Sequence, residues 1–95
     1  MTSTLTSQAT VATEKPVPYM RQLCKHFGHK LDAAFDDDSG YIQFGSGRCD
    51  LHAGERKLHL TVTAEDDASR ERLRNVVGSH LERFGRRDEL SVTWN

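Results

Sequence analysis

The sequence predicts an α+β fold in which two helices pack on one face of an antiparallel sheet. Two segments carry apolar residues at helical spacing along one side only, and the segments around them alternate apolar and polar residues as half-buried strands do. Clusters of turn-forming residues separate consecutive strand segments, which favours short antiparallel connections. Because each helix is apolar on one side, both are expected to bury that side against the sheet.

The N-terminal part of the chain predicts a disordered start, a strand and a helix. Residues 1–7 are rich in Ser and Thr and are expected to be frayed, so a single α+β domain is expected over residues 8–95. Residues 8–13 alternate small apolar and polar side chains and suit an outer strand. A helix begins near Pro16, and Gly28 is expected to end it in a left-handed cap. Its apolar stripe is Tyr19, Met20, Leu23, Cys24 and Phe27.

The middle of the chain predicts a hairpin followed by a phase change. Residues 31–35 and 41–44 alternate around the turn-forming run 36–40. Apolar positions then switch from even numbers (Ile42, Phe44) to odd numbers (Cys49, Leu51) across residues 45–47. Such a switch requires an extra residue or a tight turn, and the favoured interpretation is a bulge that bends one long strand.

The C-terminal part predicts a strand, a helix and a last strand. Residues 58–64 alternate, and Asp66 or Asp67 can cap a second helix that stops at Gly85. The helix has the apolar stripe Leu73, Val76, Val77, Leu81 and Phe84, and Leu90, Val92 and Trp94 alternate after it. The predicted order is β-α-β-β-β-α-β, which is the ferredoxin-like split βαβ layout with an added strand.

Composition excludes several classes of function. The 95 residues include 13 Lys and Arg against 14 Asp and Glu, so no global charge draws the protein to nucleic acid or to an anionic membrane. No apolar run is long enough to span a bilayer, and the N-terminus lacks the features of a signal peptide, so a cytoplasmic protein is expected. In that compartment Cys24 and Cys49 are expected to be reduced thiols rather than a disulfide.

Histidines are the leading candidates for binding chemistry. His80 follows Leu73, Val76 and Val77 by seven, four and three residues, so it is expected to be at least half buried. It then either makes a structural hydrogen bond or lines a ligand or metal pocket. His26 and His29 could share a metal ion, although the simpler interpretation is two surface imidazoles near a helix C-terminus.

The remaining candidates give weaker signals. His52 and His59 alternate away from the apolar residues of their strands and are expected to be solvated. Arg83 belongs to an arginine cluster that neighbouring acids neutralise, and an anion site there stays open. No nucleophile elbow, phosphate-binding loop or zinc-protease motif is present, so a small enzyme that uses Cys49 and a histidine is the minority hypothesis.

Several segments resemble a bacterial domain-of-unknown-function family, the one numbered 2218. The resemblance runs from Ala9 to Trp94 and rests on Tyr19, the run 22–30, the triplet Gly47-Arg48-Cys49, and the segment 80–94. Gly45 and Ser46 differ from the bulkier residues usual before the triplet. Family-typical positions that match are Cys24, His26, His29, Arg48, Cys49, His80 and Arg83.

The resemblance implies little about activity, because the family has none established. Some members look fused to, or encoded near, siderophore-interacting flavin reductases, which implies an accessory role in iron handling with such a reductase as partner. The leading hypothesis is therefore a binding module, monomeric or weakly dimeric, that takes iron, zinc or a small ligand. His80, Arg48, Cys49, Cys24 and Arg83 are its expected ligand-binding residues, and His26 with His29 its expected metal ligands. A structural interaction domain is the alternative.

Overall fold

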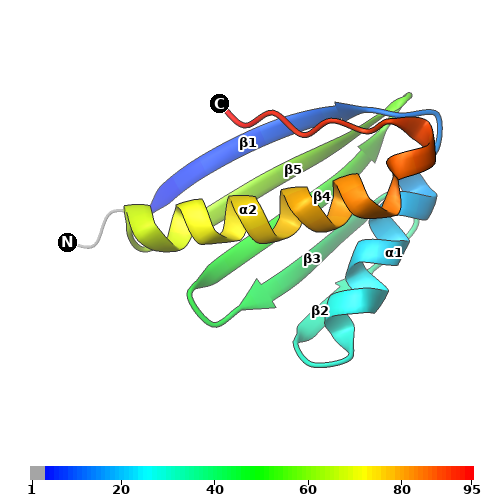
Figure 1. Cartoon of the computed structure of the whole chain (residues 1–95). Coiled ribbons are helices and arrows are strands. Elements are labelled where there is room, and N and C mark those ends of the chain that lie inside the picture. Colours follow the sequence, from blue (N-terminus) through cyan, green and yellow to red (C-terminus); the bar gives the residue numbers. More distant parts are fainter. Residues whose placement is uncertain (1–3) are drawn as a thin grey trace.

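A five-stranded antiparallel sheet and two helices make up the computed structural model, which describes residues 4–95 (Figure 1). Along the chain lie β1 (Leu5–Ala12), α1 (Pro16–Gly28), β2 (Asp32–Phe35), β3 (Ser39–Phe44), β4 (Gly47–Gly54), β5 (Lys57–Ala64), α2 (Asp67–Phe84) and the short 3-10 helix η1 (Arg86–Asp88). The strands are ordered β1-β5-β4-β3-β2. Both helices lie on the same face of the sheet, as predicted.

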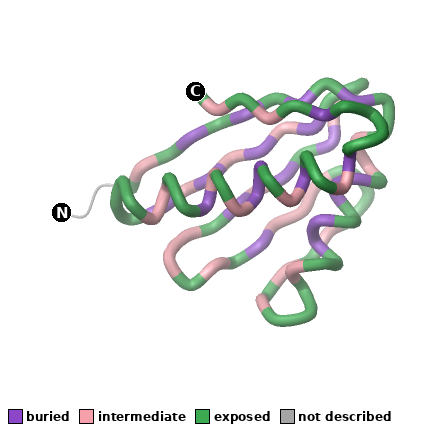
Figure 2. Tube along the Cα trace, in the orientation of Figure 1, coloured by how far each residue is buried: buried purple, intermediate pink, exposed green. Residues whose placement is uncertain are grey.

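The core lies between the sheet and the helices (Figure 2). Alternate residues of each strand point into it, so Val11, Cys49, Leu60 and Val62 are buried while the residues between them are not. From the helices, Met20, Leu23, Leu73, Val77 and Leu81 complete it, each no more than 2% exposed. The sheet therefore has one inner face beneath the helices and one outer face that no helix covers.

The expected bulge at residues 45–47 is wrong. Gly45 and Ser46 are the two turn residues of a hairpin, and Phe44 pairs with Gly47 on the opposite strand. In this register Ile42 lies opposite Cys49, so an even position of β3 and an odd position of β4 share the inner face. The phase change in the sequence therefore marks a chain reversal and not a bend.

The two ends of the chain also differ from expectation. Residues 5–7, expected in the disordered start, belong to β1, and Ser7 is 1% exposed; residues 1–3 lie outside the described residues. At the other end, the expected last strand is reduced to one bridge between Ala9 and Trp94 beside β1. The Asn95 amide bonds to the Gln8 carbonyl oxygen beside this bridge, and the amide of Val92 donates to Glu82 Oε2 of α2 at 2.9 Å.

Three of the four helix ends lie where the sequence predicts them, and the fourth ends differently. Pro16 begins α1, Asp66 caps α2 by accepting from the Ser69 amide at 2.7 Å, and Gly85 follows the last residue of α2. Gly28, however, is still helical, and the cap residue His29 has φ −67°, so no left-handed cap forms. The amides of Lys30 and Leu31 both bond to the Phe27 carbonyl oxygen and end the helix without one.

A polar contact fixes η1 against α1. The Tyr19 hydroxyl donates to Asp88 Oδ2, and Lys15 Nζ lies 3.6 Å from the same oxygen. The hydrogen bond and the cation hold the pKa of Asp88 below its usual range, and the same bond raises the pKa of Tyr19. This pairing gives the hydroxyl group of Tyr19, a residue of the apolar stripe, a hydrogen-bond partner.

Candidate ligand site at the junction of the helices

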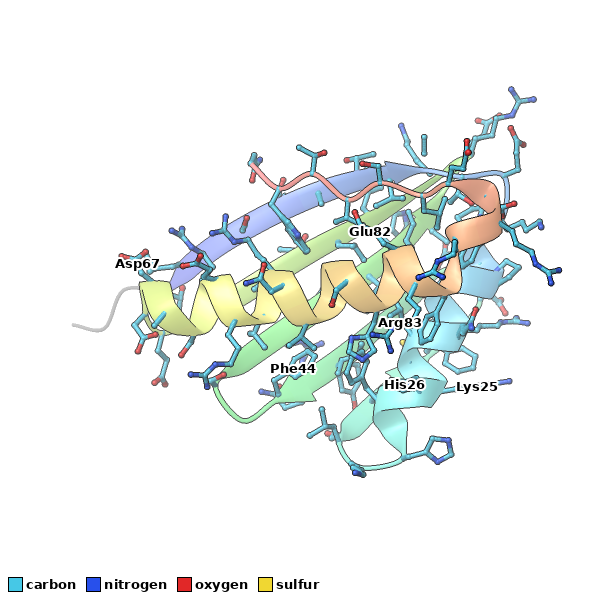
Figure 3. All side chains as sticks on the ribbon, viewed as in Figure 1. Lys25, His26, Phe44, Asp67, Glu82 and Arg83 are labelled. Atoms are coloured by element: carbon cyan, nitrogen blue, oxygen red, sulfur yellow. The ribbon has the colours of Figure 1, made fainter. Side chains whose placement is uncertain are left out.

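Five aromatic rings meet where α1 and α2 approach each other. The His26 ring lies 5.0 Å from the His80 ring, measured between centroids, and Phe27 lies 5.0 Å from His80. Phe84 and Phe44 complete the group, at 5.5 Å from His26 and 5.4 Å from Phe27 respectively. Figure 3 shows His26, Phe44 and Arg83 around this junction, which we call the helix junction.

His80 is partly buried, as its place in the apolar stripe predicts. Its Nδ1 lies 2.7 Å from the backbone oxygen of Val76. A carbonyl oxygen only accepts, so Nδ1 must carry the proton and, in the neutral ring, Nε2 has the lone pair. Of the two alternatives left open by the sequence, the structure shows the structural hydrogen bond, which satisfies one nitrogen and leaves the other able to accept.

Two open hollows flank His26. The first, of about 490 Å³, is lined by His26, Phe27, His29, Lys30 and Leu31. The second, of about 580 Å³, is lined by Pro18, Arg21, Gln22, Lys25, His26, His29 and Phe84. Neither lining includes a carboxylate, whereas three residues are Lys or Arg. The hollows are therefore suited to a negatively charged group beside an apolar one.

The cations of these hollows are available for a ligand. No ion pair among residues 4–95 involves Arg21, Lys25 or Lys30. The Arg21 guanidinium lies 5.7 Å from the centre of the Phe35 ring, so its described neighbour is an aromatic ring. In Figure 3 the Lys25 side chain extends from α1 away from the sheet.

His26 and His29, the predicted metal ligands, do not pair with each other in the structure; His26 contacts His80 instead. Both imidazoles line the same hollows, but the ring in contact with His26 is His80, from the other helix. His29 is exposed at the end of α1. Within residues 4–95 no group of three or more His, Cys, Asp or Glu side chains is placed to hold a metal ion. With Arg21, Lys25 and Lys30 in their lining, the two hollows fit an anion better than a cation.

The two cysteines lie in the core and not at the junction. Cys24 is 2% and Cys49 0% exposed, and neither lines a hollow beside His26. Burial raises the pKa of Cys24 to about 11 and raises the pKa of Cys49 still further. A nucleophilic thiol needs the opposite shift, so the geometry does not fit an enzyme that uses either cysteine.

Arg48 lies on the outer face of the sheet, opposite the face on which its neighbour Cys49 is buried. Its guanidinium is 4.4 Å from the centre of the Tyr41 ring, and its Nε is 2.9 Å from Asp50 Oδ1. It helps to line a separate hollow of about 510 Å³ that also includes Tyr41, Asp50 and His52. Arg83, by contrast, lies near the helix junction on the exposed side of α2.

The structure therefore divides the predicted residues among three places. His26, His29, His80 and Arg83 lie at or near the helix junction, Cys24 and Cys49 in the core, and Arg48 on the outer face. Sequence reasoning missed Arg21, Lys25 and Lys30. A signal was present, because Arg21, Lys25 and His29 follow one another at spacing four and so share one side of α1.

Comparisons with known proteins give a family and a fold. A family model described as "Uncharacterized protein conserved in bacteria (DUF2218)" matches residues 8–95. The NMR structure of PA4090 from Pseudomonas aeruginosa is similar, with 32% sequence identity, a TM-score of 0.80, and a match covering 95% of this chain and 94% of that chain. No curated protein matches the sequence. Neither description mentions iron, a siderophore or a reductase.

No helix in residues 4–95 is both long and apolar enough to cross a membrane.

Proposed function

The chain belongs to the DUF2218 family of uncharacterized bacterial proteins, and from that premise we propose that it is a non-catalytic module that binds a small anionic molecule at the helix junction. The ligand class is an organic carboxylate with an aromatic or apolar part. A single observation carries the proposal, which is that both hollows beside His26 are lined by cations and aromatic rings without a carboxylate.

The chemistry of the lining supports this ligand class. Arg21, Lys25 and Lys30 supply charge-assisted hydrogen bonds, which are stronger than neutral ones. The Phe27 and Phe84 rings supply an apolar surface beside them. The C-terminal end of α1 explains part of the basic composition, because cations are favoured there, but Arg21 lies outside its last turn.

The role in iron handling that the family resemblance implies is kept here only as one possible ligand, an anionic iron chelate. An anionic iron chelate has the charge that the hollows favour, and it brings its own metal ligands. Zinc or iron as free ions fit less well, since the cations Arg21, Lys25 and Lys30 line the hollows. The partner proposed from the family resemblance, a siderophore-interacting reductase, would be the source or the recipient of such a chelate.

Amide chemical shifts of the ¹⁵N-labelled protein would test the proposal with benzoate as the probe and benzyl alcohol as its uncharged control. Benzoate is expected to shift amides between Arg21 and Leu31, and benzyl alcohol to shift them far less. Inorganic phosphate separates a general anion site from one that also needs the ring. Equal shifts with benzoate and benzyl alcohol, or benzoate shifts located elsewhere, would contradict the proposal.

Charge-matched variants sharpen the experiment. Lys25→Gln removes one cation from a hollow, and Arg72→Gln removes one cation from the exposed side of α2. Lys25→Gln is expected to weaken benzoate binding by roughly tenfold, which corresponds to one charge-assisted hydrogen bond. Arg72→Gln is expected to leave it unchanged. An equal loss in both variants would mean that net charge, and not the hollow, attracts the anion.

A further inference from the structure

Four polar residues lie side by side across four strands on the outer face of the sheet. In the pairing register Ser39 is opposite His52, His52 is opposite His59, and His59 is opposite Thr10. The two imidazole rings stack with their centroids 6.2 Å apart and their planes 20° from parallel. We call Thr10, His59, His52 and Ser39 the histidine row.

Each imidazole has a hydroxyl group as neighbour on the next strand of the row, away from the other imidazole. His59 Nδ1 lies 3.1 Å from Thr10 Oγ1, and His52 Nδ1 lies 3.4 Å from Ser39 Oγ. No hydrogen bond between described residues uses the Nε2 atom of either ring. A hydroxyl oxygen can accept from a ring N–H, which leaves the lone pair of a neutral imidazole on Nε2.

We propose that the histidine row binds a divalent transition-metal cation, of the class of Ni²⁺, Zn²⁺ or Cu²⁺, through the Nε2 atoms of His52 and His59. Neutral imidazole suits these ions, and metal ligands characteristically hydrogen-bond through the other ring nitrogen, as both rings do here. Nitrogen atoms that share such an ion lie within about 4 Å of each other, since each metal–nitrogen bond is about 2.0–2.1 Å. With their centroids 6.2 Å apart and their planes 20° from parallel, the two rings have to tilt toward each other to bind one ion.

The surroundings set the character of the site. Asp50 and Lys57 each lie two residues from a histidine of the row on the same face, and Asp50 is paired with Arg48 there. The described residues supply only two metal ligands here, so water or a second molecule fills the other positions. The bound ion is therefore exchangeable, unlike a structural metal. This site is independent of the helix junction, which lies on the other side of the sheet.

A titration of the tag-free, ¹⁵N-labelled full chain with Ni²⁺ tests the proposal, because paramagnetic Ni²⁺ broadens amide signals close to where it binds. Broadening is expected first around the histidine row. His52→Ala and His59→Ala are each expected to weaken binding by roughly tenfold or more, and Thr10→Val, which removes only the orienting hydroxyl, by a smaller factor. The matched control His29→Ala is expected to leave this binding unchanged.

Because the changed side chains are on the surface, signals from the core report whether each variant is folded. The proposal is overturned if the first broadening appears around His26 and His80. It is also overturned if folded His52→Ala and His59→Ala bind Ni²⁺ as the unchanged protein does, or if no broadening occurs at Ni²⁺ concentrations that saturate a free two-histidine peptide. None of these results alters the benzoate experiment at the helix junction.

Discussion

Cys49 and Arg48 are neighbours in β4, but they point to opposite faces of the sheet. The Cys49 side chain is buried beneath the helices, whereas the Arg48 side chain is exposed and lies over the Tyr41 ring. The same division runs through every strand of the sheet, because successive side chains point to opposite faces. Inner residues contact the helices and hold the fold together. Outer residues lie on the face opposite the helices (Figure 1). The Gly47-Arg48-Cys49 motif, on which the resemblance to the family partly rests, thus contains one residue for the outer face and one for the core.

The glycine of this motif belongs to the inner side of the comparison. A Cβ atom placed on Gly47 would lie 2.4 Å from the Thr63 carbonyl oxygen and 2.6 Å from Leu73 Cδ1. Backbone on the next strand cannot move away cheaply, so glycine is required by close packing. The three residues of the motif therefore need no common chemical role.

The largest expected difference between the two faces comes from two neighbours in β5. Leu60→Ala removes a fully buried side chain and is expected to lower the free energy of unfolding by about 2–5 kcal/mol. Thr61→Ala changes the outer face and is expected to cost less than about 1 kcal/mol. Urea unfolding of both variants measures this contrast. Similar losses would mean that the outer face is also covered, for example by another molecule.

The buried thiols predict a loss of stability at alkaline pH. Burial raises the pKa of Cys24 to about 11, from the value near 9 expected of an exposed thiol. The unfolded chain therefore releases the thiol proton first, and the stabilisation, complete below pH 9, is lost as pH rises toward 11. The loss for Cys24 is roughly 2–3 kcal/mol.

Urea unfolding at pH 8, 9.5 and 10.5 measures this loss, with Cys24→Ala as the control for all other titrating groups. The variant is expected to lose less stability over the same range. Identical pH profiles would show that the thiol is accessible in the folded protein and would contradict its place on the inner face.

The smallest expected effect is at Arg48. Arg48→Gln removes the contact with Tyr41 and the ion pair with Asp50, whose side chains are 46% and 48% exposed. Exposed pairs of this kind contribute less than about 1 kcal/mol. The midpoint of urea unfolding is therefore expected to change only slightly. A loss of stability as large as that of Leu60→Ala would contradict the expected difference in stability contribution between the inner and outer faces.

By itself, the sequence determined the fold class, both helices and the inner positions of the strands, because hydrophobic periodicity reports directly which side of an element is buried. It also placed His80 in a half-buried position. The hairpin at Gly45 and Ser46 could not be separated from a bulge, since both shift the apolar phase by one residue. The choice depended on whether β3 and β4 pair with each other.

Only the tertiary structure decided which distant residues meet. The contact of His26 with His80 joins residues on two helices, and the histidine row joins four strands, so neither follows from local spacing. The predicted last strand likewise meets β1 at a single bridge, and its Val92 amide bonds to Glu82 of α2, a partner that periodicity does not encode. Local sequence fixes which face a side chain occupies, whereas its neighbours on that face are set by the packing and register of segments far apart in the chain.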